Sequence, residues 1–303
     1  ANTEKYITSV DGKKLSLYEI TSERLLFSRT FKHVIQDSQY IMFAREAEER
    51  LLVGTHRMVC TLNTLKWRVE HALMLGEDEL LWAVSLSGSL LTIRTGDRLR
   101  VLSLRSFVEL SSTEFSDNFC QKMIAKGKYI YLLRWSNSFL FGRKLYIEKL
   151  SIVTCEVLWR SEIYPEYLED FSIQSMFLCG DSIIIALHDE LLALSCSDGK
   201  KIAAKQLDST GSSGLIAGES SFTIVHQTRD GLAYREFDSS LAMLDTYNYR
   251  YEEQKTPGEF LYLSLRDNSV VCVLDPSNST AYLLTKQKGE IQCESFELPL
   301  AGE

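Results

Sequence analysis

The chain of 303 residues has only four prolines and almost no long helical pattern, and none of its apolar runs approaches the roughly 18 residues that a membrane-spanning helix needs. Its first 20 residues also lack the basic and then apolar pattern of a signal peptide. Basic charge is scarce too, because the formal net charge is −8 and the pI is about 5.3. Net charge does not exclude a local basic face, but this balance is not that of a nucleic-acid-binding domain. We therefore expect no membrane insertion and no direct nucleic-acid ligand.

Cysteine occurs seven times without any CxxC pair, so the sequence lacks the spacing that structural zinc sites and redox motifs use. Four of the seven lie inside or beside apolar runs, where free cysteine behaves as a small hydrophobic residue. The sequence therefore predicts reduced core thiols and a cytoplasmic or nuclear protein, since disulfides rarely persist there. The cysteines are Cys60, Cys120, Cys155, Cys179, Cys196, Cys272 and Cys293.

What the chain does contain is a long series of short apolar runs such as "YIYLLR", "SIIIALH" and "SVVCVLD". Each run is rich in β-branched and aromatic residues and is bounded by Gly, Asp, Asn or Ser, which is the signature of strands and hairpins. The best helix candidate, Phe43–Leu52, is only about three turns long and lies between two strand-like runs. We interpret it as a charged hairpin connection, with a single helical turn as the alternative.

The predicted strands come in groups of four. The distance in sequence between one inner residue of each last strand and the next gives the repeat period. The intervals between the chosen residues are 40, 41, 51, 43, 42 and 47, which is the period of a β-propeller blade. The sequence therefore predicts an all-β fold, a single β-propeller domain over residues 1–303 with seven blades of four antiparallel strands. A large β-sandwich, or two β domains, is the alternative. The chosen residues are Phe27, Trp67, Val108, Trp159, Ile202, Leu244 and Ile291, and the predicted blades span 1–36, 37–74, 75–114, 115–168, 169–210, 211–256 and 257–303.

Blade endings such as "LSIVTCEVLWR" and "LALSCSDGKKIAAKQL", together with the period, give the chain a family resemblance. Over nearly its full length it resembles the WD40-like and quinoprotein-like β-propeller superfamily. The Trp-Asp dipeptide and the Gly-His pair of well-formed WD repeats are absent. The chain is therefore similar to a degenerate propeller, and no specific family is identified.

The opening group has three predicted strands rather than four, so closing the ring calls for another strand. The segment "ESFELPL" near the C-terminus is available for this, and a missing edge strand or a strand from a partner chain are the alternatives. The tetrapeptide Asp-Gly-Lys-Lys occurs at Asp11 and again at Asp198. We interpret both copies as tight hairpin turns, because Asp-Gly supplies the positive φ that such turns need. The first is expected between the second and third strands of the incomplete blade, and the second between the third and fourth strands of the fifth.

No motif predicts a catalytic residue, a cofactor or a metal site. The Gly- and Ser-rich stretch Asp208–Ser221 lacks the G-x-x-x-x-G-K-[ST] pattern of a phosphate loop, and G-x-S-x-G does not occur. Three histidines, His56, His188 and His226, fall at strand ends, where a catalytic base could lie. We interpret them as structural, and Asp208–Ser221 as a loop between blades.

The first candidate interaction surface is the hairpin link in "RWSNSFLFGRKLYIEK", within the longest repeat. Trp135 and Phe139 lie there with Arg143 and Lys144, and exposed aromatics beside arginine are typical of binding hot spots. The same repeat adds "YPEYLED", which holds Tyr164 and Tyr167. The alternative is that these aromatics fold back onto the blade.

The second candidate surface is the stretch "DTYNYRYEEQKTPGEF". Tyr247, Tyr249 and Tyr251 alternate with other residues and so share one side of an extended strand. Half-exposed tyrosines suit protein recognition. The alternative is that they pack on the adjacent blade.

A strong repeat without a catalytic constellation favours a non-catalytic protein–protein interaction scaffold, a subunit or domain of a larger intracellular complex. Its expected partners are one or more proteins of that complex. One alternative is a propeller enzyme, hydrolase or quinoprotein-like, with a site at the ring centre. Another is a regulatory subunit of an RNA-modifying or RNA-binding complex.

Overall fold

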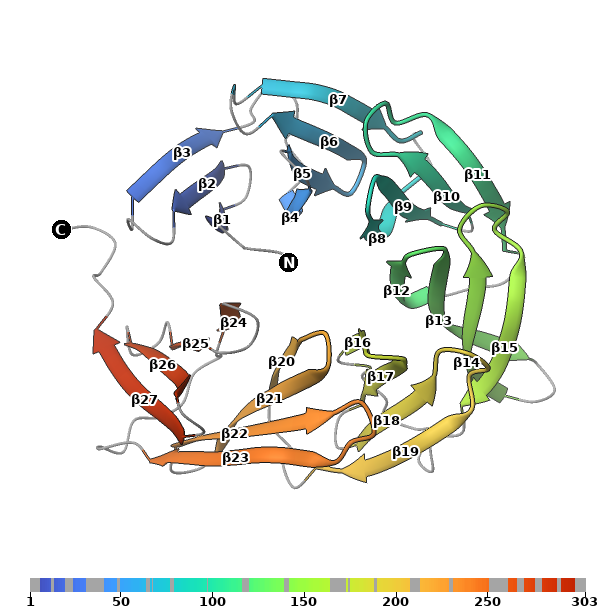
Figure 1. Cartoon of the computed structure of the whole chain (residues 1–303). Helices are drawn as coiled ribbons and strands as arrows, with labels where there is room; N and C mark the ends of the chain where they lie inside the picture. The colour runs from blue at the N-terminus through green and yellow to red at the C-terminus, as the bar shows by residue number, and fades with distance from the viewer. Residues whose placement is uncertain are drawn as a thin grey trace. The chain divides into compact units, whose positions relative to one another are not determined.

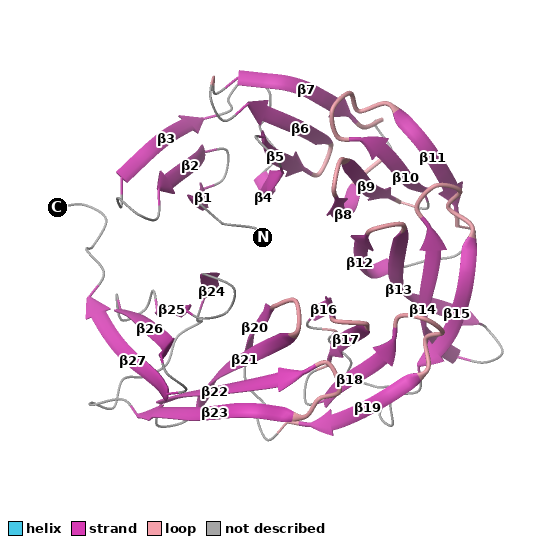
Figure 2. Cartoon of the chain, in the orientation of Figure 1, coloured by secondary structure: helices cyan, strands magenta, loops and turns pink. Residues whose placement is uncertain are grey.

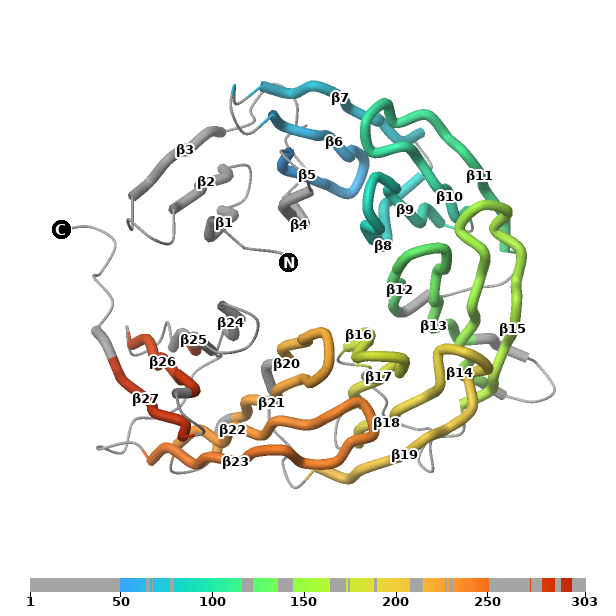
Figure 3. The backbone as a smooth tube through the Cα atoms, viewed as in Figure 1, coloured from blue at the N-terminus to red at the C-terminus, as the bar shows by residue number. Residues whose placement is uncertain are grey.

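The structure of the 303-residue chain is a computed structural model, and it divides into two compact units, Ala1–Pro165 and Glu166–Glu303, which are described separately. Every described secondary-structure element is a β-strand (Figures 1 and 2). Side chains are described from Arg50 onward, with some further gaps. Figure 3 shows the backbone as a tube, coloured along the chain over these residues. The described residues are 6–11, 14–19, 24–30, 41–47, 50–63, 66, 68–76, 79–96, 98–115, 120–138, 142–163, 173, 175–187, 190–207, 213–228, 231–250, 261–265, 270–275, 280–287 and 290–297.

The first unit contains one three-stranded sheet and three four-stranded sheets among the described strands, and neighbours in each sheet are consecutive in the chain. The three-stranded sheet has β1 (Tyr6–Asp11), β2 (Lys14–Glu19) and β3 (Arg24–Thr30). The next has β4 (Ile41–Ala47), β5 (Arg50–Thr55), β6 (Met58–Asn63) and β7 (Arg68–Met74). The third has β8 (Leu81–Ser87), β9 (Leu90–Thr95), β10 (Arg98–Ser103) and β11 (Glu109–Glu114). The fourth has β12 (Cys120–Lys126), β13 (Tyr129–Ser138), β14 (Gly142–Ser151) and β15 (Val157–Ile163).

The second unit contains three four-stranded sheets with the same order of strands. One has β16 (Ser175–Cys179), β17 (Ser182–Ala186), β18 (Glu190–Ser195) and β19 (Lys201–Gln206). The next has β20 (Ser213–Ala217), β21 (Ser221–Thr228), β22 (Gly231–Asp238) and β23 (Met243–Arg250). The last has β24 (Leu261–Leu265), β25 (Val270–Asp275), β26 (Thr280–Gln287) and β27 (Glu290–Glu297).

The order of the strands confirms the predicted pattern of antiparallel hairpins. Phe43–Leu52 forms a hairpin, as expected, but its residues belong to β4 and β5 themselves, which pair as far as Ala47 opposite Arg50. The sheets follow one another along the chain as the predicted repeat requires. The exact blade limits and the assignment of the whole chain to one domain stay predictions.

From the sheet of β4–β7 onward, where side chains are described, each sheet buries apolar side chains against the next sheet in its unit, so these cores lie between sheets. In the first unit, Leu52 and Val59 of one sheet pack with Leu91 and Ile93 of the following sheet. In the second unit, Ile184 of β17 packs in one cluster with Phe222 of β21. The first strands are also neighbours, because β8 lies beside β12 and β20 lies beside both β16 and β24. A four-stranded sheet that is covered on both faces in this way does not need a second layer of its own.

The pairing of third and fourth strands contains a β-bulge at an equivalent place in five consecutive four-stranded sheets. The extra residue on the fourth strand is Glu70, Leu110, Leu158, Ile202 or Leu244, according to the sheet. A bulge adds one residue to one strand and so shifts the alternation of inward and outward side chains.

Three of the seven residues that the repeat predicted to face inward are in fact exposed. Val108, Ile202 and Leu244 were expected to point inward, but they are 57%, 48% and 55% exposed. Ile202 and Leu244 are the extra residues of their bulges, and Val108 lies just before β11. Trp159 is half-buried and Ile291 is buried, while the side chains of Phe27 and Trp67 lie outside the described residues.

A turn with one residue at positive φ joins the third and fourth strands of four sheets. That residue is Gly199 in the second Asp-Gly-Lys-Lys copy, with φ of 72°, and its N–H donates to Ser195 O at 2.9 Å. Phe107, Cys155 and Leu241 take the same role at φ of 55°, 58° and 66°. Their buried side chains enter the cores between sheets, which offsets the strain of the left-handed backbone. In the same turn, the Lys200 side chain bonds to the Asp198 carboxylate and lowers its pKa to about 2.

The second Asp-Gly-Lys-Lys copy is a turn between β18 and β19, as predicted. The first lies between β1 and β2, which pair as far as Asp11 opposite Lys14, and its Gly12 and Lys13 lie outside the described residues. The segment "ESFELPL" was expected to be available for closing the ring. Its first four residues, Glu294–Glu297, instead pair with β26 as part of β27, and the remainder lies outside the described residues. None of the described residues forms a helix that could span a membrane.

The five cysteines that the structure describes are free thiols. Cys60, Cys155 and Cys179 are buried, which agrees with the prediction of core thiols. Burial raises the pKa of the Cys60 thiol to about 12, so almost none of it is the reactive thiolate at neutral pH. Cys120 and Cys272 have no described side chain.

Candidate functional site

The hairpin that was predicted to carry Trp135 and Phe139 is built differently from expectation. Strands β13 and β14 pair from Tyr129 opposite Ser151 to Ser138 opposite Gly142, so the expected hairpin link is mostly strand. Trp135 is half-buried inside β13, opposite Leu145.

Of the other residues predicted in this repeat, only Lys144 has a described side chain. It forms an ion pair with Glu162 of β15 at 2.9 Å. Arg143 lies in β14 without a described side chain, and Phe139, Tyr164 and Tyr167 lie outside the described residues. The role of this group in binding stays a prediction.

The predicted tyrosine row lies on β23, the outer strand of its sheet. Tyr247 and Tyr249 are half-buried and alternate with exposed residues, as the shared side required. Both pack on the core that their sheet forms with the last sheet, and the ring centroids of Tyr249 and Tyr282 are 5.8 Å apart. Burial raises the pKa of Tyr247. Tyr247 and Tyr249 therefore pack against the adjacent sheet, which was the alternative to an exposed recognition surface. Tyr251 lies outside the described residues.

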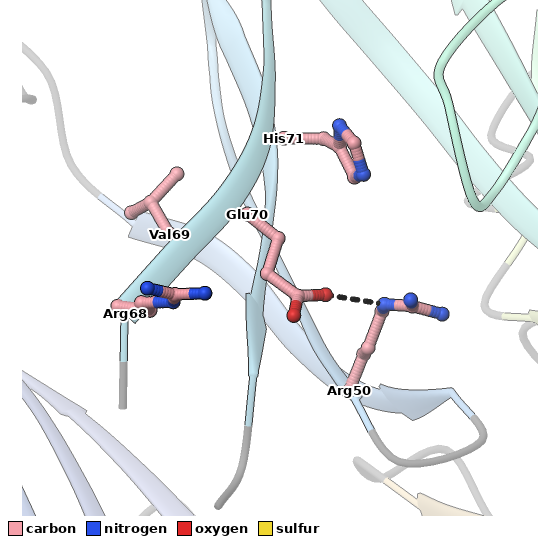
Figure 4. A pocket seen from close by; sticks show the side chains of 5 residues that line it. All are labelled: Arg50, Arg68, Val69, Glu70 and His71. Carbon is pink, nitrogen blue, oxygen red and sulfur yellow. Dashed lines mark hydrogen bonds and ion pairs between the residues drawn. The ribbon is translucent and has the colours of Figure 1, made fainter. Parts of the chain in front are cut away.

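A shallow, open depression of about 400 Å³ lies at one end of the second sheet and is lined by Arg50, Arg68, Val69, Glu70 and His71 (Figure 4). The bulge residue Glu70 accepts hydrogen bonds from Arg50 Nε at 2.7 Å and Asn63 Nδ2 at 2.8 Å. These two donors lower the pKa of its carboxyl. His71 points away from this pair, and its ring lies 6.1 Å from that of Phe107. The carboxylate is thus occupied by its own neighbours, and we assign no ligand to the depression.

The described residues bring together no group of three or more His, Cys, Asp or Glu side chains that could hold a metal ion. His56 is exposed in the turn between β5 and β6, and His226 is buried in β21. His188 lies outside the described residues.

The most exposed aromatic side chain that the structure describes is one that the sequence interpretation did not single out. Trp82 is 56% exposed, and the nearby Met74 and Leu80 are 55% and 40% exposed. We call these three residues the Trp82 patch. A bulge between Leu81 and Ala83 causes the exposure, because Trp82 is the extra residue of β8 and leaves the buried face. The run "LLWAV" did not indicate this exposure, since a uniformly apolar run is typical of a strand that is buried on both faces.

Backbone hydrogen bonds bring the two parts of the Trp82 patch together. Leu75 N–H donates to Arg57 O at 2.9 Å, and Leu81 N–H donates to His56 O at 2.7 Å. The carbonyls of His56 and Arg57, which are adjacent in one turn, therefore hold Leu81 and Leu75. Leu75 follows Met74, and Leu81 precedes Trp82. The side chains of Leu75 and Leu81 are buried and anchor the segment from below.

Glu79 bonds to described residues on both sides of it, between the two parts of the patch. Its carboxylate accepts from Gly76 N–H at 3.2 Å and from Thr95 Oγ1 at 3.3 Å, and its own N–H donates to Gly76 O at 3.1 Å. Arg100 lies 3.9 Å from the same carboxylate. Glu79 is thus tied to β9 and β10, and the described residues on either side of positions 77 and 78, Gly76 and Glu79, are bonded to each other.

Comparisons with known proteins identify a fold and no family. No family model matches the sequence, and no curated protein matches it. Among solved structures, Kluyveromyces lactis Hsv2p is 11% identical with a TM-score of 0.65, and the match covers 98% of this chain and 96% of that chain. BamB from Moraxella catarrhalis is 13% identical with a TM-score of 0.58, covering 98% and 86%. A chain of the mitotic checkpoint complex is 10% identical with a TM-score of 0.65, covering 90% and 81%. These neighbours are β-propellers, and this chain shares their all-β propeller fold.

Proposed function

We propose that the chain is a non-catalytic protein–protein interaction scaffold within a larger intracellular complex, and that the Trp82 patch is one of its contact surfaces. The observation that carries the proposal is a tryptophan more than half exposed in β8, with Met74 and Leu80 also exposed and with Glu79 bonded to Gly76 and Thr95. Single exposed apolar residues are ordinary, but a cluster of large ones is typical of a binding site. Tryptophan and methionine are both enriched at protein interfaces.

The fold supports the same proposal in general terms. One similar chain is part of the mitotic checkpoint complex, an assembly of proteins. Propellers host unrelated functions, so this likeness does not identify a partner. The free thiols of Cys60, Cys155 and Cys179 support an intracellular location, in the cytoplasm or nucleus, where cysteines remain reduced.

Replacement of Trp82 by alanine is the test of this proposal. An anchor tryptophan at the centre of an interface contributes about 2 kcal/mol or more, or roughly a 30-fold change in affinity. We therefore expect that a tagged Trp82→Ala chain recovers its main partners from native extract at least tenfold less well than the wild-type chain. The measurement is quantitative mass spectrometry of the captured proteins.

Leu244→Ala is the matched control, since Leu244 is equally exposed and also the extra residue of a bulge. The control should recover partners as the wild-type chain does, and both variants should keep the wild-type Tm. Unchanged recovery with Trp82→Ala would remove the patch from the proposed function.

A further inference from the structure

A second exposed apolar surface lies where the sheet of β8–β11 packs on the sheet of β12–β15, within the first unit. Ser111 Oγ of β11 donates to Ile152 O at 3.1 Å, in the turn between β14 and β15. Leu110, just before Ser111, is 56% exposed, and Val153, just after Ile152, is 70% exposed. One hydrogen bond between the two sheets therefore has a large exposed apolar residue on either side of it.

The turn between β12 and β13 adds two lysines to this surface. Ile152 N–H donates to Lys128 O at 2.9 Å, so Lys128 and Val153 are neighbours. The side chains of Lys126 and Lys128 are exposed, and neither forms an ion pair in the part of the chain that the structure describes. Glu156, the single acidic residue of the two turns, accepts a hydrogen bond within its own turn. We call this surface the Val153 patch, and its members are Leu110, Lys126, Lys128 and Val153.

The fold does not require these residue types, because an equivalent pair of turns occurs in the sheet of β16–β19 with different side chains. There, Cys196 N–H donates to Asp181 O at 2.9 Å. Asp181 thus takes the place of Lys128, and Ser197, which follows Cys196, takes the place of Val153. An aspartate and a serine satisfy the same turn geometry. An exposed valine beside an exposed lysine is therefore not needed for folding.

We propose that the Val153 patch binds a short segment of a partner protein in which aliphatic residues lie next to aspartate or glutamate. The inference rests on the proposed scaffold function, and it adds a contact surface on other turns than those of the Trp82 patch. The aliphatic side chains of the segment cover Leu110 and Val153, and its carboxylates pair with Lys126 and Lys128. Complementary charges of this kind orient a partner and suppress wrong ones.

The number of cations favours a protein over other anionic surfaces. Sequences that bind anionic lipids carry clusters of about four to eight Lys or Arg residues. Strong binding to DNA uses about six to ten phosphate contacts. The Val153 patch has two lysines, Lys126 and Lys128, and the chain as a whole has a net charge of −8. Two cations beside an apolar contact suit a short acidic segment of a protein.

The test compares the wild-type chain with two variants that copy the sheet of β16–β19, Val153→Ser and Lys128→Asp. Both should keep the wild-type Tm, because serine and aspartate occupy the equivalent positions there. The probe is a phage library of random peptides, captured on each immobilised chain. We expect a set of peptides that the wild-type chain captures and Val153→Ser loses, and this set should be enriched in Asp and Glu. Lys128→Asp should capture the same set at least tenfold less well, because it brings like charges together.

Three results would overturn the inference: no peptide that depends on Val153, dependent peptides without an excess of Asp and Glu, or unchanged capture of them by Lys128→Asp. Binding to vesicles of phosphatidylserine and phosphatidylcholine that Val153→Ser abolishes would also overturn it, since the patch would then be a membrane contact. Trp82→Ala should capture the same peptides as the wild-type chain. If the peptides fail while Trp82→Ala still loses its partners, this inference alone is removed and the proposed function stands.

Discussion

Replacement of Glu148 by alanine is expected to lower the free energy of unfolding by about 3–5 kcal/mol, the cost of leaving a buried charge without its counter-ion. Glu148 lies on β14 with a side chain only 1% exposed. It accepts from Arg134 Nη1 of β13 at 2.7 Å and from Arg160 Nε of β15 at 2.5 Å. The Arg134 side chain is 10% exposed, and its guanidinium lies 4.3 Å from the centroid of the Phe115 ring. Without Glu148, that charge stays buried and loses this ion pair.

Arg160→Ala is the control for this substitution. The Arg160 side chain is 54% exposed, so its contribution is that of a surface ion pair, about 0–1 kcal/mol. The measurement is the denaturant midpoint with its m-value for both variants. Equal and small changes for Glu148→Ala and Arg160→Ala would contradict the described burial of this charge cluster.

Truncation of Phe222 to alanine is expected to have a similar effect in the second unit, again about 3–5 kcal/mol, because a buried aromatic side chain is lost and a cavity remains. Phe222 is 0% exposed in β21. Its ring lies 5.0 Å from that of Phe177 in an edge-on arrangement and 5.4 Å from that of Phe237 in a stacked one. The contact with Phe177 of β16 joins the sheet of β16–β19 to the sheet of β20–β23, while Phe237 lies on β22 of the same sheet as Phe222.

Leu244→Ala serves again as the control, since a largely exposed side chain in the same sheet should change stability by no more than about 0.5 kcal/mol. Thermal unfolding followed by near-UV circular dichroism would report both variants. If Phe222→Ala unfolds at the wild-type temperature, the core between these sheets is not packed as described.

The strands and their grouping could be predicted because short apolar runs and Gly, Asp and Asn turns are local signals. The second Asp-Gly-Lys-Lys turn is an example, since Gly199 adopts the positive φ that its sequence indicates. The bulges could not be predicted, because a bulge depends on how two strands pair and not on the pattern within either one. For that reason Ile202 and Leu244 were expected inside and lie outside.

The same limit applies to the candidate site. The sequence drew attention to Trp135 and Tyr249, which are aromatic and lie near charged residues, but both are half-buried in regular strands. Trp82 lies in a uniformly apolar run, which is typical of a core strand, and only the bulge beside Leu81 exposes it. Exposure of an aromatic residue is a property of the pairing, so it became visible only in the structure.

The native size of the assembly that contains this chain tests the proposed scaffold role most directly. The chain alone has a mass of 34.6 kDa. After gentle lysis of the cells that naturally express it, the tagged chain should sediment at physiological salt as a stable species well above that mass. Sedimentation of nearly all of it at the mass of the tagged chain alone, both with and without prior crosslinking, would contradict a role as a subunit of a larger complex.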